Sequence, residues 1–184
     1  MNVSTGLPSP MDEAAPLKSR LICGMISADP VWFDKAVDIL MQRFGPIDIT
    51  SDTFDFDFTD YYNDETGSPL FRKFIAFATP VSPDDLADIK RQTNEIERDF
   101  SACSASKYPR PINIDPGYVT PSKLVLASMK DFSHRICLDH GVYAEVTMLY
   151  NRGWQTLPWT FPDYGSGRYF AFLDSCRENL LQGM

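Results

Sequence analysis

Residues 112–150 read INIDPGYVTPSKLVLASMKDFSHRICLDHGVYAEVTMLY. Apolar residues recur through this segment at spacings typical of strands and of a short helix, so we expect it to be anchored to a core. Polar residues of varied chemistry stand close together among them, which is how a pocket with functional groups is built. These polar residues are Asp115, Tyr118, Lys123, Lys130, Asp131, His134, Arg135 and Glu145.

Local signals divide this segment. The residues Asp115-Pro116-Gly117-Tyr118 are typical of a turn, because proline fixes one dihedral angle and glycine accepts a positive φ. Thr120-Pro121 predicts the start of a short helix with Leu124, Val125 and Met129 on its inner side. In that helix Lys123 and Lys130, seven residues apart, would share one face.

Residues 134–138 and 142–150 predict a β-hairpin whose register depends on its loop. A two-residue loop at 139–140 or 140–141 would place His134 on the face of Glu145. A three-residue loop at 139–141 would place Arg135 opposite Glu145 instead. We favour the three-residue loop because Gly141 then takes the positive φ angle. In the second strand we expect two faces, one with Val142, Ala144, Val146 and Met148 and the other with Tyr143, Glu145 and Thr147.

The preceding residues predict alternating strands and helices. Residues 21–26 (LICGMI) are typical of a buried strand, and Asp29-Pro30 predicts the start of a helix that runs to about Phe44. Residues 47–58 (IDITSDTFDFDF) predict a strand with Phe54, Phe56 and Phe58 facing the core, and residues 73–79 predict another strand. A second helix is expected from Ser82 or Pro83 to Phe100, with Leu86, Ile89, Thr93, Ile96 and Phe100 on its buried face, followed by a strand at 112–114.

The resulting order βαββαβ predicts an α+β fold with a ferredoxin-like antiparallel sheet and both helices on one face. The C-terminal hairpin and a helix at residues 168–181 would extend it, although other α/β connections stay open. Residues 1–17, rich in Ser and Pro, predict a disordered tail, and residues 18–184 predict a single domain.

Composition restricts the protein class. No apolar run approaches the roughly 20 residues of a membrane helix, and the first residues do not resemble a secretory signal, so we expect a cytoplasmic protein without a membrane partner. The four cysteines lack metal-site and redox spacings, and Cys23 and Cys137 are interpreted as core residues. The oligomeric state is left undetermined.

The net charge of −8 makes nucleic acid an improbable partner, because nucleic-acid surfaces need many basic contacts. Residues 107–135 are the exception, with five basic and two acidic side chains. A local basic cluster on an acidic protein suits one small anion such as phosphate.

The chain resembles a bacterial family known only as domain of unknown function 4416, over about residues 20–182. The resemblance rests on DFDFTDYY (55–62), IKRQTNEIE (89–97), NIDPGY (113–118), KLVLASMKDFSHRI (123–136), GVYAEVTMLY (141–150) and PWTFPDY (158–164). It implies no reaction, because members of the family are generally uncharacterised. The chain also lacks the GxxxxGK[ST] loop of nucleotide-binding proteins.

Two functions therefore compete. The first is a protein that binds or acts on a phosphorylated or nucleotide-like small molecule, with no firm prediction that it is an enzyme. Its catalytic candidates are His134, Glu145 and Asp115. The carboxylate of Asp115 or Glu145 could hold magnesium, but no set of metal ligands is predicted. Its ligand-binding candidates are Lys123, Lys130, Arg135, Tyr118, Asp60, Tyr61, Asn94, Trp159 and Tyr164. The second is a non-catalytic interaction module in which the polar cluster is a structural network.

Overall fold

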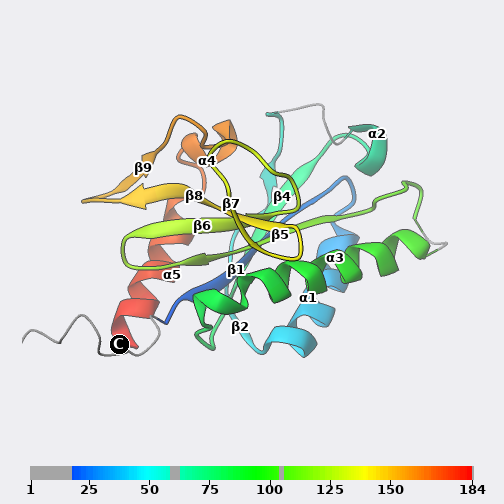
Figure 1. The fold of residues 1–184 in the computed structure, drawn as a ribbon. Helices are drawn as coiled ribbons and strands as arrows, with labels where there is room; N and C mark the ends of the chain where they lie inside the picture. Colours follow the sequence, from blue (N-terminus) through cyan, green and yellow to red (C-terminus); the bar gives the residue numbers. More distant parts are fainter. Residues whose placement is uncertain (1–17, 59–62, 104–105, 184) are drawn as a thin grey trace, which may run out of the picture.

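The structure is a computed structural model, which describes residues 18–58, 63–103 and 106–183. The tail expected at residues 1–17 and the candidate ligands Asp60 and Tyr61 lie outside these ranges. The described residues form one sheet of nine strands (Figure 1), namely β1 (Arg20–Ser27), β2 (Ile47–Thr50), β3 (Phe54–Asp55), β4 (Phe71–Phe77), β5 (Asn113–Val119), β6 (Lys123–Ser128), β7 (Ile136–Asp139), β8 (Val142–Tyr150) and β9 (Trp154–Thr156).

The described helices are α1 (Val31–Phe44), α2 (Asn63–Thr66), α3 (Leu86–Ala102), α4 (Pro162–Gly165) and α5 (Phe170–Gln182), with a 3-10 turn η1 (Pro83–Asp85) before α3. The helices predicted at Asp29-Pro30 and at Ser82-Pro83 are present; α1 begins at Val31, and at the second position the turn η1 precedes α3. The Asp29 carboxylate accepts a hydrogen bond from the Val31 amide at 3.0 Å, and the Ser82 hydroxyl accepts one from the Asp84 amide. Within the described ranges, no helix is long and apolar enough to cross a membrane.

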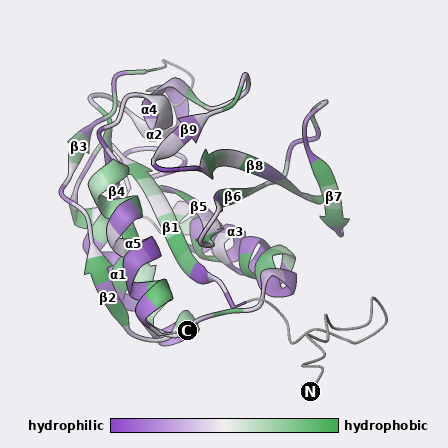
Figure 2. Ribbon diagram, turned by 90° about the vertical axis from the view of Figure 1, so that its left-hand side faces the viewer, coloured by the Kyte–Doolittle hydropathy of each residue, from purple (hydrophilic) through white to green (hydrophobic). Residues whose placement is uncertain are grey.

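The sheet is antiparallel throughout, with the order β2-β4-β1-β5-β6-β8-β7; β3 pairs with β4 and β9 with β8. The mixed α+β class is therefore confirmed. The sheet is larger than the predicted four-stranded ferredoxin-like arrangement, because β6, β8 and β7 continue it beyond β5. The edge strand β7 is coloured hydrophobic in Figure 2, and its Ile136 is 72% exposed.

Side chains alternate across the sheet and build a core on each face. On β1, Leu21, Cys23 and Met25 pack against buried residues of α1 and α3, while Ile22 packs with residues of α5. The sheet thus lies between a layer of α1 and α3 and a layer that contains α5 (Figure 1). All five residues predicted to line the buried face of α3 are buried, namely Leu86, Ile89, Thr93, Ile96 and Phe100.

The predicted helix after Thr120-Pro121 is wrong, because residues 123–128 form strand β6. Leu124 and Val125 join different cores on opposite faces of the sheet, an alternation that only a strand provides. Lys123 and Lys130 therefore do not share a helix face. The predicted turn at residues 115–118 is also wrong, because these residues lie inside β5 and pair with β1.

Three finer predictions need correction. The strand expected at 47–58 is interrupted between β2 and β3, although Phe56 is buried and Asp55 and Asp57 are exposed as the alternation predicts. Cys137 is exposed because β7 is an edge strand. Met148 packs with Leu124, not with Val142 and Val146, because the pairing of β8 with β6 shifts by one residue between Val146 and Met148.

Candidate functional site

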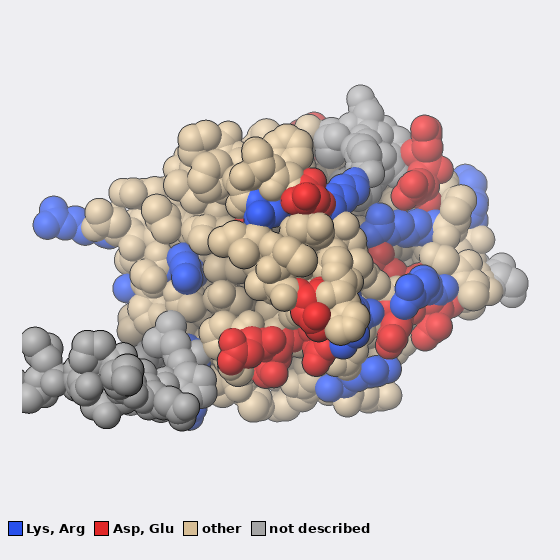
Figure 3. Space-filling model, in the orientation of Figure 1, with Lys and Arg blue, Asp and Glu red and all other residues tan. Residues whose placement is uncertain are grey.

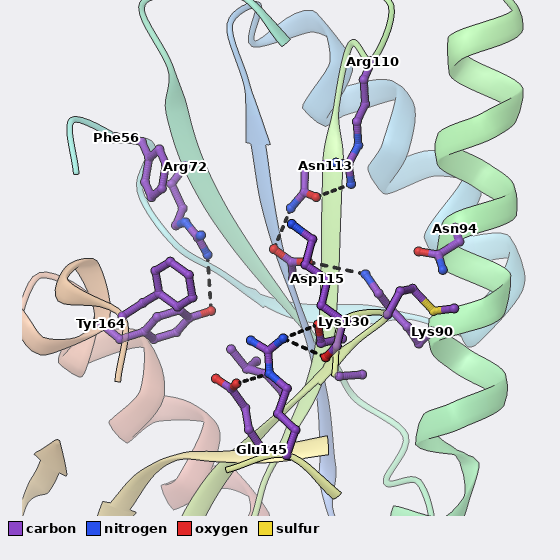
Figure 4. Close-up of a pocket in the computed structure, with 16 residues that line it drawn as sticks. Phe56, Arg72, Lys90, Asn94, Arg110, Asn113, Asp115, Lys130, Glu145 and Tyr164 are labelled. Carbon is purple, nitrogen blue, oxygen red and sulfur yellow. Dashed lines mark hydrogen bonds and ion pairs between the residues drawn. The ribbon is translucent and has the colours of Figure 1, made fainter. Parts of the chain in front are cut away.

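A cavity of about 260 Å³ lies where strands β5 and β6 separate. The two strands pair from Val119↔Leu124 to Gly117↔Leu126, and then pairing stops. Beyond that point β5 continues beside β1 and β6 continues beside β8, so the residues between them face an opening in the sheet. Figure 4 shows residues of both walls around this opening.

The sequence of β5 explains why the strands separate. The backbone N–H and C=O groups of successive residues in a strand point to opposite sides. Those of Ile114 and Pro116 therefore point to the same side, toward β6, and proline has no N–H with which to donate a hydrogen bond. At Ile114 two side chains of α3 replace the missing strand. Glu97 Oε1 accepts from the Ile114 amide at 2.8 Å, and Lys90 Nζ donates to the Ile114 carbonyl at 3.0 Å. Both polar groups of that peptide are satisfied without β6, which keeps the opening stable.

The cavity is rich in basic side chains although the protein is acidic. Its lining has five basic residues against two acidic ones, whereas the whole chain carries −8. On the face seen in Figure 3, Lys and Arg side chains are interspersed with Asp and Glu, so this face carries no broad basic patch. The lining residues are Phe56, Arg72, Lys90, Asn94, Arg110, Asn113, Asp115, Leu126, Ala127, Ser128, Met129, Lys130, Arg135, Glu145, Phe161 and Tyr164.

Arg72 enters the cavity from β4 and is 5% exposed. Its Nη1 donates to the Tyr164 hydroxyl at 3.3 Å, and its Nε lies 3.3 Å from Asp163 Oδ2 without hydrogen-bond geometry. The guanidinium carbon lies 4.9 Å from the ring centre of Phe56 and 5.3 Å from those of Phe74 and Tyr164, which hold the cation in place. Burial raises the pKa of Tyr164 against the opposing effect of Arg72, so the phenol stays neutral.

Asp115 lies at the centre of the view in Figure 4 and contacts one amide and one ammonium group. Its carboxylate accepts from Asn113 Nδ2 at 2.5 Å and from Lys90 Nζ at 3.4 Å. Burial alone would raise the pKa of Asp115, but the charges of Lys90 and Arg72 outweigh it and hold the pKa below its usual value. Asp115 is therefore ionised at neutral pH.

A second ion pair closes this end of the cavity. Arg110 Nε and Nη2 both donate to Glu97 Oε2, at 2.9 and 2.6 Å, and Arg110 Nη2 also donates to Asn113 Oδ1. Burial raises the pKa of Glu97, against the lowering effects of Lys90 and Arg110. Arg110, Glu97 and Asn113 thus continue the polar network that begins at Asp115.

Glu145 receives hydrogen bonds from three residues, of which Thr147 donates to Oε1 at 3.4 Å. Its side chain is 4% exposed, and Oε2 accepts from Arg135 Nε at 2.7 Å and from His134 Nε2 at 3.0 Å. Arg135 Nη1 also donates to Ser128 Oγ and to the Lys130 carbonyl, both at 2.9 Å. Arg135 therefore ties the end of β6 to β8.

The predicted three-residue hairpin loop is wrong. Asp139 pairs with Val142, and His140 and Gly141 form a two-residue turn with φ angles of 45° and 75°. The register then shifts at Leu138, so that Ile136 pairs with Ala144. This bulge restores the relationship predicted for the longer loop, with Arg135 opposite Glu145. His134 also contacts the Glu145 carboxylate, so both residues that the two loop lengths would place beside Glu145 are found there.

Six of the residues proposed from the sequence line the cavity: Asn94, Asp115, Lys130, Arg135, Glu145 and Tyr164. Four described candidates do not line it: Tyr118, Lys123, His134 and Trp159. Tyr118 packs with the core under the start of α3, and Lys123 stands at the far end of β6, paired with Leu149. Trp159 stacks on His134 at 5.1 Å and donates to the Val146 carbonyl, so these two rings stand behind Glu145.

The sequence interpretation missed Arg72, Lys90, Arg110 and Asn113. Lys90 offered a signal, because it follows Ile89 on the buried stripe of α3 and one turn later Asn94 follows Thr93. Arg72 offered a weaker one as one of two charges, with Lys73, among the apolar residues of β4. Among the described residues, no group of three or more His, Cys, Asp or Glu side chains could hold a metal ion.

Comparison with known proteins gives a family but no function. No curated protein and no solved structure is significantly similar to this chain. One family model, described as Domain of unknown function (DUF4416), matches residues 17–180, which include every residue that lines the cavity. The chain belongs to the DUF4416 family.

Proposed function

We propose that this protein binds a small phosphorylated or nucleotide-like molecule in the cavity between β5 and β6. The excess of basic side chains supports an anionic ligand, because a concave site with low-dielectric walls concentrates the field of its charges. A phosphate group carries up to two negative charges and several acceptor oxygens, which matches such a lining.

Arg72 is the observation that carries this proposal. A guanidinium has N–H donors on all three nitrogens, yet within the described part of the chain Arg72 makes a single hydrogen bond, to Tyr164. A buried cation that is under-satisfied costs free energy unless a ligand completes it. Phosphate oxygens are matched partners for the planar fork of arginine, which the rings of Phe56 and Tyr164 already hold in place.

The carboxylates are assigned supporting roles. Asp115 and Glu145 reach the cavity, so either could accept a proton or a hydroxyl hydrogen from a bound ligand. His134 would act through Glu145, whose carboxylate it holds, and not on the ligand directly. The proposal is therefore one of binding, and chemistry at Asp115 or Glu145 would be additional.

A purely structural role for the polar cluster is the competing function, and the contacts of Arg135 favour it for that residue. Arg135 donates to Glu145, Ser128 and the Lys130 carbonyl, which is the pattern of an anchor. Arg72 also has structural partners in Tyr164 and Asp163, but its Nε makes no hydrogen bond within the described residues, so this explanation is incomplete for Arg72.

We also propose that β1, α1, β2, β4, α3 and β5 form a ferredoxin-like unit inside a single domain of residues 18–184. The strand order β2-β4-β1-β5 and the position of α1 and α3 on one face support this assignment. The opening would then lie at the junction between this unit and the strands that extend it.

Thermal unfolding with added ligand tests the binding proposal. Inorganic phosphate, glucose 6-phosphate and AMP serve as probes, and at least one of them should raise the unfolding temperature in a concentration-dependent way. At about 100 times its Kd a ligand adds about 2.7 kcal/mol to the free energy of unfolding.

Variants locate the site. Arg72→Lys and Lys130→Gln should reduce the stabilisation by the ligand, because both residues line the cavity. Lys123→Gln, at the end of β6 away from the cavity, should leave this stabilisation unchanged. Protection by none of the three probes would overturn the proposal, and so would equal protection of the wild type and the Arg72→Lys protein.

A further inference from the structure

The cavity contains hydrogen-bond acceptors that a plain anion site does not need. Asp115 and Glu145 are carboxylates in the same lining as the basic residues, and a carboxylate repels a phosphate group. An ionised carboxylate only accepts hydrogen bonds, so its ligand must offer donors. The ligand therefore carries hydrogen-bond donors in addition to its negative charge.

Asn94 adds an independent observation. It lies one helical turn after Lys90 on α3 and lines the cavity, and Figure 4 shows both side chains on the helix wall, across from Arg72. Within the residues that the structure describes, the Asn94 amide makes no hydrogen bond, although it is only partly exposed. An amide offers one acceptor oxygen and two N–H donors, and a hydroxyl group is the partner that matches both.

The opposite wall provides an apolar surface. Phe56, Arg72 and Tyr164 lie on that side in Figure 4, and Phe161, which also lines the cavity, is 50% exposed. The negative face of an aromatic ring attracts the weakly positive hydrogens of a C–H surface. One polar wall and one aromatic wall suit a ring that has hydroxyl groups at its edge and C–H groups on its face.

The size of the cavity favours a small ligand. Its volume of about 260 Å³ is below the roughly 300 to 1,000 Å³ of pockets that enclose drug-sized molecules. A sugar ring with one phosphate is smaller than a nucleotide and is the closer match to this volume. The volume therefore favours the smaller of the two ligand types that the charge alone leaves open.

We propose that the ligand is the monophosphate of a small polyhydroxy compound, such as a pentose or hexose phosphate, with its phosphate at Arg72 and its hydroxyl groups at Asn94 and Asp115. This inference rests on the proposed function and specifies its ligand. Asn94 is the specificity residue, because it can donate to one hydroxyl and accept from another, while Asp115 accepts a further hydroxyl hydrogen.

Isothermal titration with five probes tests this assignment: ribose 5-phosphate, glucose 6-phosphate, glucose, inorganic phosphate and AMP. One of the two sugar phosphates should bind at least about tenfold more tightly than inorganic phosphate and than AMP, since each satisfied hydroxyl contributes a hydrogen bond. Glucose should bind more weakly than the sugar phosphate, because it lacks the charge that Arg72 recognises.

Two variants separate the two halves of the ligand. Asn94→Ala should lower the affinity for the sugar phosphate about tenfold and leave the affinity for inorganic phosphate unchanged. This variant should fold normally, because Asn94 has no hydrogen-bond partner to lose within the described residues. Arg72→Lys should weaken the binding of both probes.

The outcomes distinguish the ligand class from the binding function. If AMP or inorganic phosphate binds as tightly as the tighter-binding sugar phosphate, the polyhydroxy assignment is overturned while phosphate binding stands. An Asn94→Ala protein with unchanged affinity for the sugar phosphate overturns it as well. If none of the phosphorylated probes binds, both the assignment and the proposed function fail.

Discussion

Lys90 on α3 donates a hydrogen bond at 3.0 Å to the carbonyl oxygen of Ile114 on β5, at a position where a neighbouring strand would otherwise pair. The same ammonium group lies 3.4 Å from Asp115 Oδ1 at the cavity. One side chain therefore both completes the edge of β5 and holds a carboxylate of the candidate site. The stability of β5 and the position of the Asp115 carboxylate are therefore coupled through Lys90.

Lys90→Met should lower the free energy of unfolding by about 3 kcal/mol, because it leaves the Ile114 carbonyl without a donor and Asp115 without its nearest cation. Urea unfolding followed by circular dichroism measures the change. Arg91→Met on the same helix is the control: its pair with Asp88 is exposed, so its effect should stay within about 0.5 kcal/mol. Equal effects of the two substitutions would show that the Lys90 bond is not stabilising.

Asp115 should contribute a pH-dependent part of the stability. Its pKa is held below the usual value of 3.8, so the folded state favours the ionised form. Such a carboxylate stabilises the fold above its unfolded-state pKa and loses that contribution as the pH falls through the folded-state value. The difference in unfolding free energy between wild type and Asp115→Asn should be constant from pH 7 to about 5 and shrink below about 4. A difference that grows on acidification contradicts this assignment.

Arg135→Lys should reduce stability more than His134→Gln. An ammonium cannot copy the fork that joins Glu145, Ser128 and the Lys130 carbonyl, whereas glutamine can still donate to Glu145. We expect a loss of about 2 kcal/mol for the lysine variant and under about 1 kcal/mol for the glutamine variant. Thermal unfolding of the two proteins decides the order, and the reverse order would make His134 the main support of Glu145.

Gly117→Ala should interfere with the last residue pair before the opening. A Cβ atom at this position would lie 2.4 Å from the Val125 carbonyl oxygen and 2.5 Å from Leu126 Cδ2, so the two strands would have to move apart. We expect a loss of at least about 2 kcal/mol. Gly183→Ala is the matched control, since its nearest neighbours lie at 3.7 and 3.8 Å. A neutral Gly117→Ala would mean that β5 and β6 can shift without cost.

Phe56→Ala should cost about 3 to 5 kcal/mol, because Phe56 is 5% exposed and packs in a core cluster with Ile26 and Leu70. Phe58→Ala tests the alternation, since Phe58 is only partly buried at the edge of the same cluster and should cost less. Urea unfolding of both proteins gives the comparison. A larger loss of unfolding free energy for Phe58→Ala than for Phe56→Ala would contradict the burial of Phe56.

The sequence predicts best where a single periodicity dominates. On α3 the helical spacing of Leu86, Ile89 and Phe100 identifies the buried face, and η1 begins where the Ser82-Pro83 signal predicts. It fails at β6, where KLVLAS after Thr120-Pro121 suits a helix start as well as a strand. Pairing with β5 and β8 on both sides decides for the strand, and no local residue reveals those partners.

The candidate site was predicted in part for the same reason. Asp115, Arg135 and Glu145 lie in residues 112–150, where polar residues are closely spaced, so the local sequence identifies them. Arg72 and Lys90 come from elements whose charges look like ordinary surface charges until the fold buries them, at 5% and 4% exposure. Burial of a charge is a tertiary property, so the position of Lys90 beside the buried stripe of α3 is a hint that does not by itself separate it from exposed neighbours such as Arg91.

The short ladder between β5 and β6 divides the sheet into two leaves, one with β2, β4, β1 and β5 and the other with β6, β8 and β7. Among the described residues, the pairs from Val119↔Leu124 to Gly117↔Leu126 and the packing of α3 hold the leaves together beside the opening, and the core cluster of Ile22, Phe74, Leu124 and Met148 joins them on the α5 face. Amide hydrogen exchange should therefore be fastest along this seam and slower within each leaf, because local opening follows the weakest boundary between cooperative units. A molecule that contacts Arg72 on one leaf and Glu145 on the other would connect the two leaves. Amide hydrogen exchange along the boundary between β5 and β6 would then slow down as the cavity is filled, so the exchange rate would measure how much of the protein has bound the molecule.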